Sequence, residues 1–183
     1  MNKTDLSNYP SGELGANVSF VKRILWFFIN SLFLQSSFFP MMDFKLWLLR
    51  NFGAKIGVGV CIKPSVNIKY PWNLIIGDYT WIGEGVWIDN LGKVIIGSNV
   101  CLSQGAMLLC GNHNYKQSTF DLMVGDITIE DGAWIGAQSL VCPGVNVHSH
   151  AVLTVASVAS SDLEPYFIYR GNPAVKIKER IID

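Results

Sequence analysis

The sequence lacks any surplus of charge: its 183 residues include 14 basic and 14 acidic side chains, for a formal net charge of zero. A chain without a cationic excess does not offer the broad positive surface that binds nucleic acid, so we expect no nucleic-acid partner. It also has only four cysteines, which are widely spaced and form no C-x-x-C pair. This pattern indicates neither a disulfide framework nor a cysteine zinc site, and it suits a reducing cytoplasm.

The sequence also predicts no secretory signal and no membrane-spanning helix. Its first residues are polar and acidic, without the charged-then-apolar order of a signal peptide. Residues 24–39 are rich in Leu, Phe and Ile, but this run of sixteen residues contains polar interruptions and is shorter than the ~20 residues that a spanning helix needs. Pro40 ends the run, and we expect a second short helix over residues 42–51.

Two interpretations of this apolar N-terminal segment stay open. It can form a helical lid over one end of the following fold, which would otherwise expose an unpaired edge. Alternatively, it docks on the inner face of the cell membrane, with apolar side chains in the lipid and cations at the headgroups. The residues expected to make that contact are Trp26, Phe27, Phe28 and Phe33, with Lys22 and Arg23.

The sequence is rich in a six-residue repeat whose units each begin with an aliphatic residue. These residues are Ile56, Ile62, Ile68, Ile76, Ile82, Ile88, Ile96, Leu102, Leu108, Ile129, Ile135, Val141, Val147 and Leu153. Each unit has an apolar face that only stacked neighbours can bury, and a period of six is typical of a parallel β-helix. The fourth residue after most of these starts is small or aliphatic, which suits a narrow interior.

The interruptions of the repeat fall on every third unit. The interval between starts lengthens to eight residues after Ile68 and Ile88, and to 21 residues after Leu108. If three units make one coil, all the extra chain leaves from a single edge of a triangular prism. The last interruption is a long loop at residues 111–126, and long loops on a rigid scaffold commonly carry function. The sequence therefore predicts the active site at this edge.

The chain has only three histidines. His113 lies where the long loop begins, within Asn112-His113-Asn114-Tyr115, and a histidine at such an edge can serve as a general base. His148 and His150 stand two residues apart on turn positions of a late coil. Three histidines with this spacing do not make a convincing zinc site. We therefore expect no metal, and surface positions for His148 and His150.

The sequence predicts a strand, a turn and a short helix at the end of the chain. Residues 166–169 are strand-like, residues 171–174 read as a turn and helix start, and the expected helix carries Lys176, Lys178 and Arg180. Such cations either meet the phosphates of a nucleotide-like cofactor or form a solvated face. The chain thus divides into an N-terminal extension (1–52), a β-helix (53–161) with the loop 111–126, and a C-terminal unit (162–183).

Together these motifs resemble the hexapeptide-repeat acyltransferases, over about residues 52–182. The chain is most similar to the sugar O-acetyltransferases of the maltose and galactoside type and to the acetyltransferases assigned to colanic acid biosynthesis. The resemblance rests on the repeat, Phe52-Gly53-Ala54-Lys55-Ile56-Gly57, Trp87-Ile88-Asp89-Asn90-Leu91, Ser103-Gln104, Asn112-His113-Asn114-Tyr115, Ala133-Trp134-Ile135-Gly136-Ala137 and Gly171-Asn172-Pro173-Ala174.

This resemblance implies a mainly β fold: a left-handed parallel β-helix of about five coils, with an N-terminal helical segment and a short C-terminal helix. It also implies a homotrimer with active sites between subunits, in the cytoplasm. The implied activity is O-acetylation of a sugar hydroxyl by acetyl-CoA, in exopolysaccharide or cell-surface glycan biosynthesis. Transfer would be direct, with His113 as the general base.

The resemblance assigns further residues to the two substrates. Asp89, Asn90, Asn114 and Trp134 are expected to bind or enclose the sugar acceptor. The residues expected beside acetyl-CoA are Ala137, Val155, Ser160, Gly171, Lys176 and Lys178. Ser160-Ser161 departs from the Thr-Lys that is usual in the family and so removes a cation on the acetyl-CoA side. Two alternatives remain open: acyl transfer to an amine or to serine, and a non-catalytic trimeric scaffold.

Overall fold

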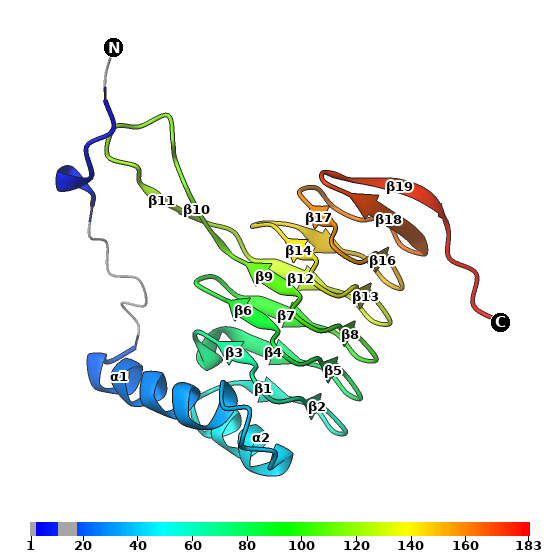
Figure 1. Cartoon of the computed structure of the whole chain (residues 1–183), viewed down its shortest axis with the longest axis horizontal. Helices are drawn as coiled ribbons and strands as arrows, with labels where there is room; N and C mark the ends of the chain where they lie inside the picture. Colours follow the sequence, from blue (N-terminus) through cyan, green and yellow to red (C-terminus); the bar gives the residue numbers. More distant parts are fainter. Residues whose placement is uncertain (1–2, 11–17) are drawn as a thin grey trace.

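The computed structural model describes residues 3–10 and 18–183, and its main body is a parallel β-helix (Figure 1). Sheet A contains β1 (Lys55–Ile56), β4 (Leu74–Ile76), β7 (Val94–Ile96), β12 (Ile127–Ile129) and β15 (Asn146–Val147). Sheet B contains β2 (Cys61–Ile62), β5 (Trp81–Ile82), β8 (Cys101–Leu102), β13 (Trp134–Ile135), β16 (Val152–Leu153), β18 (Phe167–Gly171) and β19 (Ala174–Glu179). Sheet C contains β3 (Asn67–Ile68), β6 (Trp87–Asp89), β9 (Met107–Leu109), β14 (Leu140–Val141) and β17 (Val158–Ala159).

The aliphatic repeat residues stack on one another and fill the interior of these coils. In sheet C, for example, Ile68 pairs with Ile88, Ile88 with Leu108, and Leu108 with Val141. The small residues four places after the starts are also buried: Val60, Val66, Thr80, Val86, Val100, Ala106, Ala133, Ser139, Val145, Ala151 and Ser157. The β-helix predicted from the six-residue period is therefore confirmed, with five complete coils and a partial sixth.

Two kinds of glycine permit this stacking. Gly105 has a backbone φ of +66°, a conformation that residues with a Cβ rarely adopt. Gly136 is required for a different reason, because a Cβ there would lie 2.6 Å from the backbone nitrogen of Val155 in the next coil. Both requirements follow from turns that must stack closely, coil upon coil.

The extra chain leaves from the edge between sheet C and sheet A, as the interrupted repeat predicted. After β3 this edge carries the 3₁₀ turn η3 (Pro71–Asn73), and after β6 it carries residues 90–93. After β9 the chain forms the antiparallel hairpin of β10 (Gly111–His113) and β11 (Leu122–Val124) before returning to β12. Figure 1 shows this hairpin extending away from the prism, on the side opposite sheet B.

The N-terminal helices cover the first coil. They are α1 (Phe20–Ile29), continued by a π-helical stretch η2 (Asn30–Leu34), and α2 (Met42–Asn51). The indole Nε1 of Trp26 donates to the carbonyl oxygen of Ile68 (2.9 Å), and Arg50 donates to those of Ile56 and Gly57. Leu34 and Leu49 are fully buried. These contacts cover an edge that would otherwise be open to pairing, so the helices form the expected lid.

The membrane interpretation of this segment needs a correction. Trp26 is buried and so is not available to lipid, and Phe33 is partly buried against the core. They face inward because the helix must bury an apolar stripe against the first coil. Phe27 and Phe28 are exposed. Within residues 3–10 and 18–183, no helix is both long and apolar enough to cross a membrane.

The expected C-terminal helix is wrong, because residues Ala174–Glu179 form strand β19. It pairs antiparallel with β18, which itself extends sheet B beside β16. The segment Val175-Lys176-Ile177-Lys178 alternates apolar and polar residues with a period of two, which favours a strand. By pairing with β18, β19 occupies an edge of the sheet that would otherwise be open.

Candidate active site

His113 is the last residue of β10, at the base of the turn that closes the long hairpin. It pairs with Leu122 of β11, and its backbone N–H donates to the side-chain oxygen of Asn112 (2.8 Å). The side chain is half-buried. The hairpin therefore places His113 outside the prism, on the edge where the repeat is most interrupted (Figure 1).

The imidazole of His113 is held by Phe120 from the other side of the hairpin turn. Its Nδ1 lies 2.9 Å from the backbone carbonyl oxygen of Phe120. A carbonyl oxygen can only accept, so Nδ1 carries the proton and, in the neutral ring, Nε2 keeps its lone pair. The ring of Phe120 stacks on the imidazole, with centroids 4.5 Å apart and planes 8° from parallel. This arrangement fixes one orientation and one tautomer, as a general base requires.

Asp89 lies directly below the base of this hairpin. Its backbone carbonyl accepts from the N–H of Cys110 (3.2 Å), three residues before His113. Its carboxylate is buried and lies 2.9 Å from the ammonium of Lys69 in the preceding coil. Asp89 also lines a groove of about 470 Å³ between α1 and the first two coils. A paired carboxylate in a groove is suited to accept hydrogen bonds from a ligand's hydroxyl groups.

That groove has an apolar wall on α1 and a wall of mixed aromatic and charged residues on the coils. Phe20, Ile24 and Phe27 of α1 form the apolar side, while Tyr70 and Trp87 line it near Asp89. Aromatic rings beside a carboxylate are a common arrangement for a ligand with both apolar faces and polar edges.

Two other residues expected at the acceptor have mainly structural contacts. Asn90 is fully buried, and its amide accepts from the N–H of Tyr70 (2.9 Å) and donates to the carbonyl of the same residue (2.6 Å). Asn114 accepts from the N–H of Lys116 within the hairpin turn (3.2 Å). Asn90 therefore holds the preceding coil rather than facing the groove, and Asn114 shapes the turn beside His113.

Trp134, expected at the acceptor, and the residues expected beside acetyl-CoA lie mostly on another side of the prism. Trp134 is on the outer face of sheet B, 46% exposed, and its Nε1 donates to the hydroxyl of Ser103 (2.9 Å). Ala137 and Val155 lie on successive turns between sheets B and C, where the N–H of Ala156 donates to the carbonyl of Ala137 (2.9 Å). Val155 is 64% exposed.

The remaining expected contacts lie near the C-terminus. Ser160 is exposed after β17, and the N–H of Gly171 donates to the hydroxyl of Ser157 (3.0 Å). Lys176 is paired with Glu164 (2.6 Å) and lies 4.1 Å from the centre of the Phe167 ring. Lys178 lies opposite Ile168 in the β18–β19 pair and is exposed. Of the two lysines, Lys178 has the less engaged ammonium.

The structure thus places Asn114 next to His113 and links Asp89 to the base of the same hairpin through the N–H of Cys110, but it leaves Trp134, Ala137 and Val155 on a different part of the same chain. In Figure 1 the β10–β11 hairpin points away from β13 and β16. A single chain therefore does not combine the proton-accepting histidine with the expected acetyl-CoA positions.

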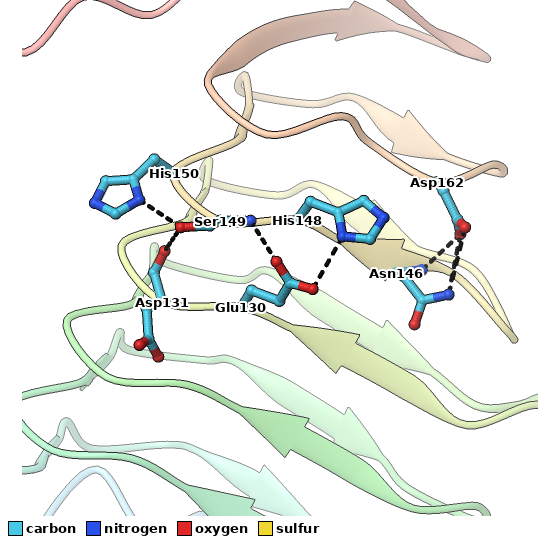
Figure 2. Close-up of polar contacts among 7 residues, drawn as sticks. All are labelled: Glu130, Asp131, Asn146, His148, Ser149, His150 and Asp162. Carbon is cyan, nitrogen blue, oxygen red and sulfur yellow. Dashed lines mark hydrogen bonds and ion pairs between the residues drawn. The ribbon is translucent and has the colours of Figure 1, made fainter.

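His148 and His150 belong to a separate network at the edge between sheets A and B (Figure 2). Nδ1 of His148 lies 2.9 Å from a carboxylate oxygen of Glu130, whose other oxygen accepts from the N–H of Ser149 (2.8 Å). His150 contacts the hydroxyl of Ser149 (2.6 Å) and stacks on Tyr166, with centroids 4.6 Å apart. Both histidines are partly exposed at the surface, as expected, and both take part in the hydrogen bonds of this turn.

Among the residues that the structure describes, no group of three or more His, Cys, Asp or Glu side chains is placed to hold a metal ion.

The chain belongs to the hexapeptide-repeat acetyltransferases and is an acyltransferase. It is 36% identical over 179 residues to "Putative colanic acid biosynthesis acetyltransferase WcaF" of Escherichia coli strain K12, with 97% of each chain covered. It is 26% identical over 135 residues to the galactoside O-acetyltransferase of the same organism, covering 72% of this chain and 66% of that relative. No family model matches the chain.

Solved structures share the fold. The hexapeptide-repeat acetyltransferase VCA0836 of Vibrio cholerae superposes with a TM-score of 0.80 at 22% identity, covering 95% of this chain and 96% of that chain. A galactoside acetyltransferase in complex with coenzyme A superposes with a TM-score of 0.77 at 24% identity, covering 87% of this chain and 80% of that chain.

Sequence reasoning missed several neighbours of the expected site residues. Lys69 stands 20 residues before Asp89, which is the length of one early coil, so the repeat itself could have paired them. Phe120 and Tyr9 contact His113 through the hairpin turn and the N-terminal segment. Neither position belongs to the repeat, so the period gave no signal for them.

Proposed function

We propose that this acyltransferase moves an acetyl group from acetyl-CoA to a sugar hydroxyl, in the biosynthesis of an exopolysaccharide or another cell-surface glycan. The similarity to WcaF over nearly the whole chain supports the glycan context. The contact between Nδ1 of His113 and the carbonyl of Phe120 supports the assignment of His113 as the general base, because it leaves Nε2 able to accept a proton.

His113 acts as the general base in a direct transfer. Nε2 accepts the proton of the acceptor hydroxyl as that oxygen forms a bond to the carbonyl carbon of the thioester. The bond from this carbon to sulfur then breaks, and the imidazolium returns its proton to the leaving thiolate. The products are the acetyl ester and free CoA, and His113 ends in its starting state. No residue of the chain is acylated.

The groove beside Asp89 binds the acceptor. The Asp89 carboxylate accepts hydrogen bonds from sugar hydroxyls, and the neighbouring ring of Trp87 packs on an apolar face of the sugar. Pairing with Lys69 orients the carboxylate. Asn114 extends the polar surface beside His113, whereas Asn90 supports the groove from behind.

Acetyl-CoA binds along the turns between sheets B and C of a neighbouring chain in a homotrimer. The backbones of Ala137 and Val155 line its pantetheine arm, with Trp134 as a wall and Ser160, Gly171 and Lys178 toward the nucleotide. This arrangement explains why one chain separates these positions from His113. The site is completed where the hairpin of one chain meets the turns of the next.

Activity of the His113→Ala variant tests this function. Thiol release from acetyl-CoA would be followed with free sugars, nucleotide sugars, amines and serine as acceptors. A general base contributes ~10²–10⁴-fold, so the variant should lose activity by that factor. His148→Ala, which removes a histidine paired with Glu130 on another edge, is the matched control. An unchanged rate for His113→Ala refutes the base assignment, and transfer only to amines or serine refutes the acceptor class.

We also propose that the outer face of α1 contacts a lipid surface. Seven large apolar side chains of α1 and η2 are exposed: Phe20, Val21, Ile24, Leu25, Phe27, Phe28 and Leu32. The same helix walls the groove at Asp89, so an acceptor held at the membrane would lie beside it. The wild type should co-sediment with phosphatidylglycerol vesicles, and a Phe27→Ser, Phe28→Ser variant should not. Equal sedimentation of the two proteins, or none by the wild type, overturns the proposal.

A further inference from the structure

We propose that the N-terminal segment formed by residues 3–10 is part of the active site, with Tyr9 as a positioning residue for His113. The proposal rests on the role of His113 as general base. It concerns a segment that lies more than 100 positions from the histidine in the sequence and belongs to no repeat unit.

The N-terminal segment is attached to the hairpin turn by a backbone hydrogen bond. The N–H of Asp5 donates to the carbonyl oxygen of Ser118, at 2.8 Å. From there the chain makes the 3₁₀ turn η1 (Leu6–Asn8), capped by the Asp5 carboxylate, which accepts from the N–H of Ser7 (3.0 Å). Hydrogen bonds from the hydroxyl of Ser7, from its backbone N–H and from the side-chain amide of Asn8 lower the pKa of Asp5. Figure 1 shows this segment beside the far end of the β10–β11 hairpin.

The capped turn brings the ring of Tyr9 against His113. The N–H of Tyr9 donates to the carbonyl of Leu6 (3.1 Å), which closes the turn just before the ring. The centroids of the Tyr9 and His113 rings are 5.9 Å apart, with planes 56° from parallel, and Tyr9 is half-buried. His113 therefore has two aromatic neighbours: Phe120 from its own hairpin and Tyr9 from the N-terminal segment.

The hairpin needs such an external contact because it lies outside the prism. Its exposed side chains include Tyr115, Met123 and Val124, so much of its surface faces solvent. A loop with few buried apolar contacts opens easily. A displacement of about 1 Å at a catalytic group can cost on the order of 10²-fold in rate. The N-terminal segment therefore holds the base in place by bonding the turn at Ser118 and packing a ring on the imidazole.

The contact of Tyr9 is made by its ring, and this determines the choice of variants. Tyr9→Ala removes the ring, whereas Tyr9→Phe keeps it and removes only the hydroxyl. An aromatic pair of this kind corresponds to about a three- to tenfold change in rate. We expect Tyr9→Ala to lower kcat by that factor without changing KM for acetyl-CoA, and Tyr9→Phe to retain wild-type kcat.

A matched control removes the ring from another tyrosine–histidine contact. Tyr166 stacks on His150 at the edge between sheets A and B, away from His113. Tyr166→Ala should leave kcat unchanged. Thermal melts of all variants would verify folding, and Tyr9→Ala should melt near the wild type because Tyr9 is only half-buried and lies outside the core of the prism.

The decisive measurement is a double-mutant cycle between Tyr9 and His113. If Tyr9 acts by holding the imidazole, Tyr9→Ala should lower kcat in the wild type and have no further effect on the residual rate of His113→Ala. The inference is overturned if Tyr9→Ala has full activity while His113→Ala is inactive, or if the two losses multiply. Full activity of His113→Ala would instead refute the proposed base, and with it this role for Tyr9.

Discussion

An active site shared between chains makes a quantitative prediction for mixed trimers. Two variants would each be inactive alone. His113→Ala lacks the base, and Val155→Trp places a large ring on the turn expected to line the pantetheine arm. Because Val155 is 64% exposed, the new ring extends into solvent and leaves the core intact. Each variant keeps the half of the site that the other lacks.

The recovered activity follows from counting. Each site would take its base from one chain and its acetyl-CoA turns from the next. In trimers assembled randomly from equal amounts, a site is intact when the first chain carries His113 and the second carries Val155. Each condition holds half the time, so about a quarter of all sites should be intact in the whole population. Tandem purification removes the two kinds of homotrimer, and each mixed trimer has one intact site of its three, so the purified species should show about a third of wild-type activity.

The assay is co-expression of the two variants with different affinity tags, tandem purification of mixed species, and measurement of thiol release. Parallel mixtures of separately purified proteins show the background without exchange. Activity equal to the sum of the two variants would place the whole site within one chain and refute the shared arrangement. Full activity of Val155→Trp alone would refute the assignment of that turn to acetyl-CoA.

Three further predictions concern the folded state. Lys45 is fully buried, and burial lowers its pKa, so the free energy of unfolding should rise as the pH rises toward 10.5. Lys45→Met should remove that pH dependence and raise the free energy of unfolding at pH 7 by about 1–3 kcal/mol, measured in denaturant titrations. Burial raises the pKa of Cys110 to about 11, so its contribution to stability should fall between pH 9 and 11. Its thiol should also resist alkylation at pH 8, whereas the half-buried Cys61 should react. Leu108→Ala empties a fully buried core position and should cost about 2–5 kcal/mol in the same titrations.

The coil architecture could be predicted because a single physical requirement repeats along the chain. Every coil needs an inward aliphatic residue on each side, and the residues that meet this need also stack in register, as Ile82 does on Leu102. The same regularity made the interruptions visible. The edge that carries the hairpin could therefore be located from residue spacing, without knowledge of how the hairpin itself folds.

Features that do not repeat were harder to predict. Residues 171–174 suggest a turn and the start of a helix, although the alternation of Val175 and Ile177 with lysines in the following segment favours a strand. Asn90 follows Asp89 directly, and sequence alone could not show that its amide is used entirely by the backbone of Tyr70. In both cases the conformation or the hydrogen bonding depends on pairing with another coil or strand, and the residues of one short segment do not show which segment will be its partner.

The coil length offers a way to recover some of these contacts. Lys69 and Asp89, and likewise Tyr70 and Asn90, are 20 residues apart and so occupy equivalent positions in adjacent coils. Pairs at this spacing become neighbours once the fold is known, so the support of the acceptor groove is encoded in the repeat. The base is different, because His113 is held by Phe120 and Tyr9, which lie outside every coil. Substitutions in residues 3–10 and in the hairpin turn should therefore alter catalysis without altering the stability of the prism. Substitutions in the core of the coils should instead lower stability without a direct effect on catalysis.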